Sequence, residues 1–144
     1  MNATNTLEAA LGNALFLGEA FPAVTQWNVV LFASLPNLDP MIDQDLDTSY
    51  EISTTNTGYQ PVRCDPGADR WIRAQNPDSE RRTVYRNTQA ITFPTALTQW
   101  GACGFGLRNQ HGQLLFYAWF ASNKTIAAGQ SAVFLPGELE IAIG

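Results

Sequence analysis

Residues 103–121 read CGFGLRNQHGQLLFYAWFA, and this stretch decides the fold. Two apolar segments, Cys103–Arg108 and Gln113–Ala121, flank a turn that ends at Gly112, where a hairpin loop favours a left-handed residue. In the second segment neither alternating face is polar, whereas a sheet with one solvated face has polar residues at every second position. We therefore predict a hairpin covered on both faces, by a second sheet on one side and by a neighbouring chain on the other.

Further strands are predicted on both sides of this hairpin. β-forming residues separated by turn signals occupy Trp27–Ser34, Gly58–Cys64, Arg70–Ala74, Arg81–Phe93, Ser131–Leu135 and Glu138–Ile143. The range Arg81–Phe93 fits either one bent strand or two. The last range alternates apolar and acidic residues, which is typical of a half-buried strand.

One segment, Thr6–Leu17, shows helical periodicity, with leucines at every fourth position. Asn5 and Glu8 fit an N-terminal capping pair, and Gly18 is expected to end the helix. A helix of three turns is only marginally stable alone, so its apolar face must pack against something. We favour packing on the sheet, with a neighbouring subunit as the alternative.

The chain has 144 residues, which is the size of one typical domain. We predict a mainly β fold, a single-domain β-sandwich or jelly roll with one N-terminal α-helix. Within it, residues 1–20 hold the helix, residues 27–144 form the sandwich, and residues 35–51 form an acidic loop.

The composition excludes several classes of protein. Charged residues make up 15% of the chain, below the roughly 25% of average soluble proteins, and the net charge is -5. A negative chain is a poor nucleic-acid binder, and no apolar run is long enough to span a bilayer. The N-terminal sequence lacks signal-peptide features, so we expect synthesis and assembly in a cytoplasm. Seven of the eight basic residues are arginine, which suits fixed ion pairs and interfaces, or reflects genomic base composition.

Residues for catalysis or cofactor binding are few. His111 is the single histidine and lies in the predicted hairpin turn, and Cys64 and Cys103 are too few for a zinc site or a disulfide framework. No nucleophile-elbow, phosphate-loop or dinucleotide-binding motif is present. We therefore predict a protein that is not an enzyme and holds no cofactor.

Five carboxylates gather in and beside the acidic loop: Asp39, Asp43, Asp45, Asp47 and Glu51. Such spacing can ligate calcium, but a loop starting at Asp43 would need glycine at position 48 and glutamate at position 54. The chain has Thr48 and Thr54 there. We favour a solvated loop over a docking surface for arginines and over a calcium site.

Six of the eight basic residues lie between positions 63 and 86: Arg63, Arg70, Arg73, Arg81, Arg82 and Arg86. Aromatic residues between them would suit single-stranded nucleic acid, but four acidic residues in the same range favour a surface of ion pairs. A protein interface is the second interpretation, in which the acidic loop of one subunit meets the arginines of the next. The candidate interface residues are Asp43, Asp45, Asp47, Arg70, Trp71, Arg73, Arg81, Arg82 and Trp119.

The C-terminal third carries short motifs that resemble those of a known family. Its residues are Phe93, Pro94, Ala96, Trp100 and Gly101, followed by Lys124, Thr125, Gly129, Pro136, Gly137 and Leu139. This order is similar to a family of small bacteriophage virion structural proteins, often labelled tail fibre or hypothetical. The chain departs from the family pattern by its longer acidic loop and by extra sequence between Asp65 and Arg82.

The resemblance implies a virion location. It favours a capsid decoration or cement protein, a jelly roll that binds the major capsid protein as a homotrimer. The alternative is a tail fibre or other tail-associated protein, which could bind a host glycan through Tyr59, Trp71 and Tyr85.

Overall fold

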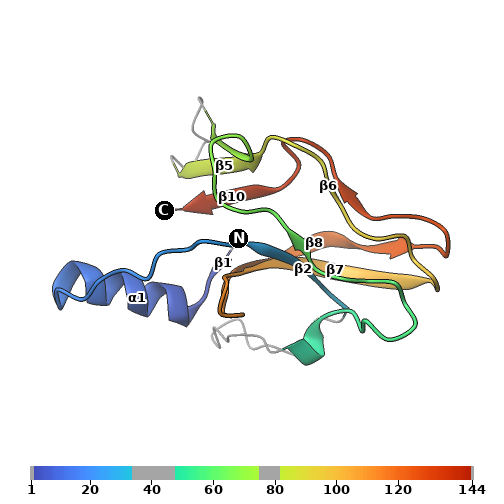
Figure 1. The fold of residues 1–144 in the computed structure, drawn as a ribbon, viewed down its shortest axis with the longest axis horizontal. Coiled ribbons are helices and arrows are strands. Elements are labelled where there is room, and N and C mark those ends of the chain that lie inside the picture. Colours follow the sequence, from blue (N-terminus) through green and yellow to red (C-terminus); the bar gives the residue numbers. More distant parts are fainter. Residues whose placement is uncertain (1, 34–47, 75–81, 144) are drawn as a thin grey trace.

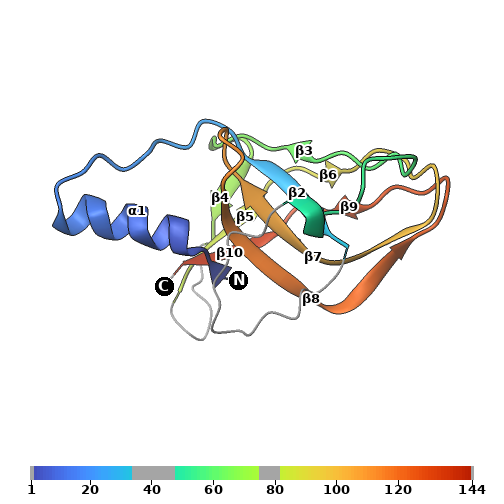
Figure 2. The same ribbon diagram turned by 90° about the horizontal axis from the view of Figure 1, so that it is seen from below.

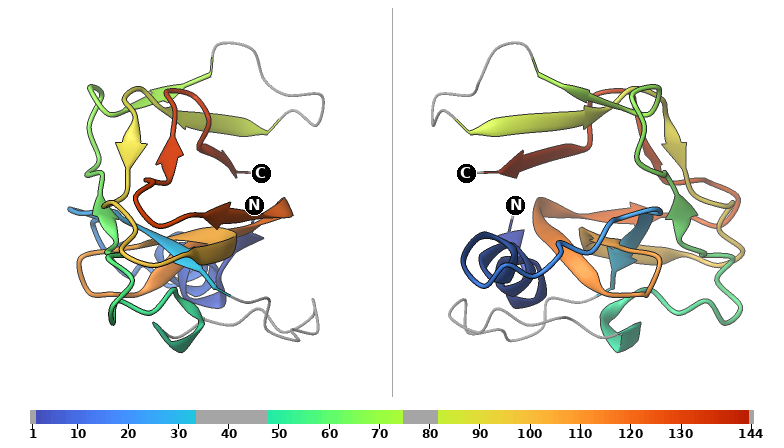
Figure 3. Two further views of the ribbon diagram at one scale, coloured as in Figure 1. Left: turned by 90° about the vertical axis from the view of Figure 1, so that its right-hand side faces the viewer. Right: turned by 60° about the vertical axis from the view of Figure 1, so that its left-hand side comes forward.

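Antiparallel strands in two facing layers form the body of the fold, and one helix extends from them (Figure 1). The computed structural model describes residues 2–33, 48–74 and 82–143. The predicted mainly β fold, a β-sandwich with one N-terminal helix, is confirmed. Figure 3 shows the two layers face to face.

The larger layer is a five-stranded sheet in the order β1-β8-β7-β2-β3, in which every pair is antiparallel. Its strands are β1 (Asn2–Ala3), β2 (Asn28–Phe32), β3 (Val62–Arg63), β7 (Trp100–Arg108) and β8 (Leu114–Ile126). The predicted hairpin is its centre, formed by β7 and β8. Gly112 has a φ of 77°, which confirms the left-handed turn residue.

The opposite layer consists of two small sheets, in the orders β10-β5-β4 and β6-β9. Their strands are β4 (Trp71–Arg73), β5 (Thr83–Asn87), β6 (Ile91–Thr92), β9 (Val133–Phe134) and β10 (Glu140–Ile143). The range Arg81–Phe93 therefore contains two strands, because the chain leaves one small sheet after Asn87 and enters the other at Ile91.

The main core fills the space between the layers. Val29 and Leu31 of β2 pair with Leu107 and Phe105 of β7, and all four side chains are buried toward the opposite layer. The intervening residues of β2 point the other way, as the two-residue period of a strand requires.

A second cluster lies on the outer face of the large sheet: Val30, Phe32, Cys103, Leu114 and Tyr117, none more than 6% exposed. Tyr50, from the short 3₁₀ helix Thr48–Tyr50, and Trp119 pack against it. Both faces of the hairpin are thus covered, as predicted. The expectation that a neighbouring chain covers one of them is wrong for these residues, because the single chain already buries them.

Two glycines of β7 make this outer cluster possible. A Cβ atom at Gly106 would lie 2.6 Å from Leu114 Cδ1 and 3.0 Å from Phe32 Cζ, and one at Gly104 would lie 2.5 Å from Trp119 Cε3. Without Cβ atoms the strand lets these side chains rest against its backbone. The rings of Phe32 and Trp119 consequently meet at a centroid distance of 5.7 Å.

Helix α1 (Asn5–Phe16) is capped by Thr4 and not by the predicted Asn5. The Thr4 hydroxyl accepts a hydrogen bond from Leu7 N at 3.4 Å and donates one to Leu114 O at 2.7 Å, and the residue is fully buried. Gly18 has a φ of 70°, and Glu19 N donates to Asn13 O at 3.2 Å, which ends the helix as predicted.

The prediction that α1 packs along the sheet is wrong beyond its first turn. Leu7 packs against the main core, but no helix residue is fully buried, and Leu15 and Phe16 are 67% and 85% exposed. The physical reason is the anchor at Thr4, from which the helix axis leads away from the sandwich (Figures 1 and 2). Among the described residues, no helix has the length and apolar character needed to cross a membrane.

A candidate binding groove between the two layers

A groove of about 410 Å³ opens between the two layers, a volume within the range of roughly 300–1,000 Å³ common for binding pockets. Aromatic and aliphatic side chains form its walls, chiefly Trp27, Trp71, Tyr85, Leu107, Phe116 and Ile141. Among the described residues that line it, Arg73 carries the one charged side chain. The groove is therefore suited to an apolar occupant with one negative group.

The small-sheet wall of the groove follows from strand alternation. Trp71 and Arg73 are two positions apart on β4 and share a face, whereas Ile72 points outward and is 52% exposed. Arg73 lies opposite Tyr85 of β5, which in turn lies opposite Ile141 of β10. The inward face of three short strands thus presents these side chains together.

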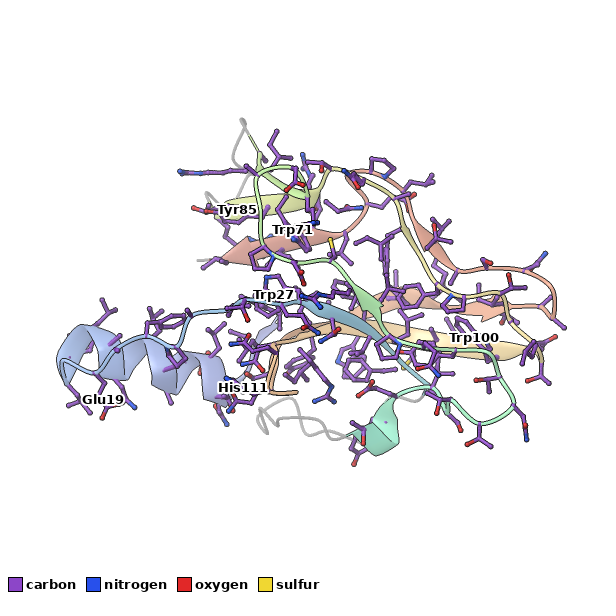
Figure 4. All side chains as sticks on the ribbon, viewed as in Figure 1. Glu19, Trp27, Trp71, Tyr85, Trp100 and His111 are labelled. Atoms are coloured by element: carbon purple, nitrogen blue, oxygen red, sulfur yellow. The ribbon has the colours of Figure 1, made fainter. Side chains whose placement is uncertain are left out.

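The large-sheet wall is built from closely packed apolar side chains. Leu107 and Phe116 pair across β7 and β8, and the Trp27 ring meets Phe116 edge-on at a centroid distance of 6.0 Å. Trp71 Nε1 donates to Cys64 O at 3.2 Å, which fixes the orientation of that indole. Figure 4 shows Trp27, Trp71 and Tyr85 at the end of the sandwich from which the helix extends.

Ion pairs neutralise several of the neighbouring arginines. Arg63 Nε lies 2.7 Å from Asp65 Oδ1, and this hydrogen bond holds the pKa of the Asp65 carboxyl below its usual value. Arg86 pairs with Glu140 at 2.7 Å across two strands. The predicted ion-pair surface is confirmed for these arginines. Arg73 forms no ion pair with a residue that the structure describes.

A buried ion pair lies away from the groove, at the end of the acidic segment. Arg108 Nη2 contacts Glu51 Oε2 at 2.8 Å, with side chains 10% and 9% exposed, and Arg108 Nη1 donates to Gly112 O at 3.0 Å. The backbone of Glu51 also forms an isolated antiparallel β-bridge with Phe32, and Ala33 N donates to Tyr50 O at 2.8 Å. This carboxylate, grouped with the acidic loop by sequence, has a structural partner in the hairpin.

The structure brings together only part of the predicted interface. Trp71 and Arg73 meet in the groove, and Arg70 is exposed beside Asp69. Arg82 is half-buried just before β5. The other predicted interface residues with charged side chains lie outside the described residues: Asp43, Asp45, Asp47 and Arg81.

Two aromatic candidates do not belong to the groove. Trp119 lies on the opposite face of the large sheet, where it packs on Phe32 and Tyr117. Tyr59 is 1% exposed, its hydroxyl accepts from Leu31 N at 2.9 Å, and burial raises its pKa, so its proposed place in a glycan platform is wrong. Sequence reasoning missed Trp27 as a site residue, because its position at the start of the predicted strand Trp27–Ser34 gave no sign that it would face Phe116.

A comparison with known protein families shows which family the chain belongs to. A family model described as podophage GP4 fiber I protein gp80 matches residues 2–142. The chain belongs to this podophage fibre protein family. No curated protein matches the chain.

Membership in the podophage fibre family makes the protein a virion component and confirms the resemblance to small phage virion structural proteins. The family description fits the tail-fibre alternative better than capsid decoration. The match spans both layers and α1, so the groove and the protruding helix are both parts of the family domain.

This fibre-family fold has a second, smaller cavity of about 310 Å³ toward β9. Phe93, Phe120 and Phe134 line it, and so does Trp100, whose buried Nε1 has no hydrogen-bond partner among the described residues. A buried donor without a partner costs stability, so water or a ligand oxygen would be favoured beside this indole.

Proposed function

We propose that this protein is a structural component of a podophage tail fibre and that it works by binding neighbouring protein chains, without catalysis. The observation that carries the proposal is the fibre-family match over residues 2–142. The apolar groove and the exposed apolar residues of α1 support it, because surfaces of this kind mark contacts between proteins.

The proposal assigns no catalytic residue. His111 is exposed in the hairpin loop, where its backbone N–H donates to Asn109 Oδ1 at 3.0 Å. A symmetric oligomer remains part of the proposal, in keeping with the closed symmetry of most homo-oligomers. Binding to the major capsid protein does not, since the fibre description favours the tail.

Host-glycan binding is a second candidate for the same groove. Trp27, Trp71 and Tyr85 offer rings on which a sugar face could stack. Specific small-ligand sites also require several convergent polar groups, and the described lining offers Arg73 and the Tyr85 hydroxyl. The aromatic surface favours the glycan, and the scarcity of polar groups favours an apolar protein segment.

The location can be tested on purified phage particles. Antibody-gold labelling in electron microscopy is expected to mark the fibres at the tail, and quantitative mass spectrometry should give few copies per particle. Heads stripped of tails serve as the matched control and should lose the protein. Labelling spread over the shell, with hundreds of copies retained on tailless heads, would overturn the fibre assignment and restore capsid decoration.

A further inference from the structure

An apolar stripe on α1 begins in the core and continues into solvent. Leu7 packs against the main core, and Leu11 and Leu15 follow it at the four-residue spacing that keeps side chains on one helix face. Leu11 is 48% exposed and Leu15 is 67% exposed, and Phe16 beside them is 85% exposed. A helix this short is marginal unless its apolar face is covered, so the stripe requires a partner surface.

The groove lies at the same end of the molecule as this helix. Ala3, two residues before α1, pairs with Phe116, which lines the groove. Yet α1 does not fill the groove of its own chain, because Thr4 fixes its first turn to β8 and the rest of the helix leads outward (Figures 2 and 4). One end of the molecule thus presents both an uncovered apolar helix and an open apolar groove.

The charges of the two surfaces are complementary. Residues 2–27 contain Glu8 and Glu19 and no arginine or lysine. The groove lining contains Arg73 and no acidic residue among the described positions. The C-terminal end of a helix also carries partial negative charge, and the last turn of α1 has no basic residue to offset it. Arg73 of another copy would supply the positive charge that the last turn of α1 lacks.

We propose that α1 of one copy lies in the groove of a second copy, with Leu15 and Phe16 against the aromatic wall and Glu19 facing Arg73. This inference rests on the proposed function, since it names the occupant through which one fibre chain binds the next. Helix and groove lie at one end of the molecule, so two copies can exchange helices reciprocally and close the assembly.

The oligomeric state of the full chain tests the proposal. Light scattering and analytical ultracentrifugation should give a defined oligomer at micromolar concentration. Leu15→Asp and Arg73→Glu should each weaken association by about 30-fold or more, as expected for central interface residues. Leu97→Asp is the matched control, because Leu97 is 69% exposed and lies outside both surfaces, and it should leave association unchanged.

A charge exchange locates the contact. Glu19→Arg alone should weaken association, and combining it with Arg73→Glu should restore most of it, because the pair is re-formed with reversed signs. At dilutions where the parent has dissociated, the melting temperatures of all variants should match that of the parent, since the four side chains changed are exposed. If Leu15→Asp does not fold, the charge-exchange set decides the question.

Several outcomes would overturn the proposal. A monomeric parent chain would do so, as would an oligomer that neither Leu15→Asp nor Arg73→Glu weakens. Binding of host polysaccharide to a monomer, lost on Trp71→Ala, would assign the groove to a glycan. The two proposals fail separately. Gold label on the shell with helix-dependent association contradicts only the fibre location, whereas label on the fibre with a monomeric chain contradicts the exchange and the symmetric oligomer but leaves the fibre location standing.

Discussion

The Thr4 side chain helps to join the helix to the sandwich, and Thr4→Val tests that role. Valine keeps the shape but removes the hydroxyl that caps α1 and bonds Leu114 O. Loss of an N-cap costs about 1 kcal/mol, and loss of a buried hydrogen bond that leaves a carbonyl unpaired costs about 1 kcal/mol or more. We expect a loss of about 2 kcal/mol in the free energy that holds α1 in place.

Hydrogen exchange followed by mass spectrometry measures this loss where it occurs. Peptides from α1 should exchange about 30-fold faster in Thr4→Val, since about 2 kcal/mol corresponds to that factor in the opening equilibrium. Peptides from β7 and β8 should be much less affected. Thr4→Ser is the matched control, because it keeps the hydroxyl and should retain most of the protection. Exchange of α1 within about twofold of the parent in Thr4→Val would refute the capping argument.

Three further substitutions test the interior. Arg108→Met should lower the free energy of unfolding by about 3–5 kcal/mol in urea titrations, since it removes the cationic partner of the buried Glu51 carboxylate, and adding Glu51→Leu should recover part of the loss. Gly106→Ala should lower the free energy of unfolding by about 1–3 kcal/mol through overpacking. Gly101→Ala is the control and should be nearly neutral, because its added Cβ would lie 3.5 Å from the nearest atom. Equal effects of the two substitutions would contradict the close-approach argument. Trp100→Phe should lower the free energy of unfolding by less than about 1.5 kcal/mol in thermal unfolding, because removing an indole N–H that has no partner among the described residues offsets the lost packing. A larger loss would show that the Trp100 N–H has a hydrogen-bond partner.

The parts of the fold that sequence predicted are those specified by local patterns. The hairpin followed from two apolar runs around Asn109–Gly112, and the end of the helix followed from Gly18. The helix cap was misplaced by one residue because Asn5 and Thr4 are both good caps. Only the tertiary contact of Thr4 with Leu114 decides between them.

The candidate site was less predictable because its walls come from distant segments. Trp71 and Arg73 were singled out for their arginine-rich surroundings, but nothing in the sequence placed them opposite Trp27 or Ile141. The direction of α1 was equally hidden. A leucine stripe predicts that the helix needs a partner, and the anchor position determines whether its own chain can be that partner.

The contacts of Glu51 have a consequence for how this family can vary. The Phe32–Glu51 bridge and the hydrogen bond from Ala33 N to Tyr50 O hold the residues that flank positions 34–47 side by side, and the ion pair with Arg108 ties Glu51 to β7. Once a loop's ends are fixed in this way, doubling its length costs only about 0.6 kcal/mol in closure entropy. The sandwich can therefore accept insertions, deletions or substitutions between residues 33 and 48. Phage sequences can diversify at these positions, and a peptide tag can be inserted there.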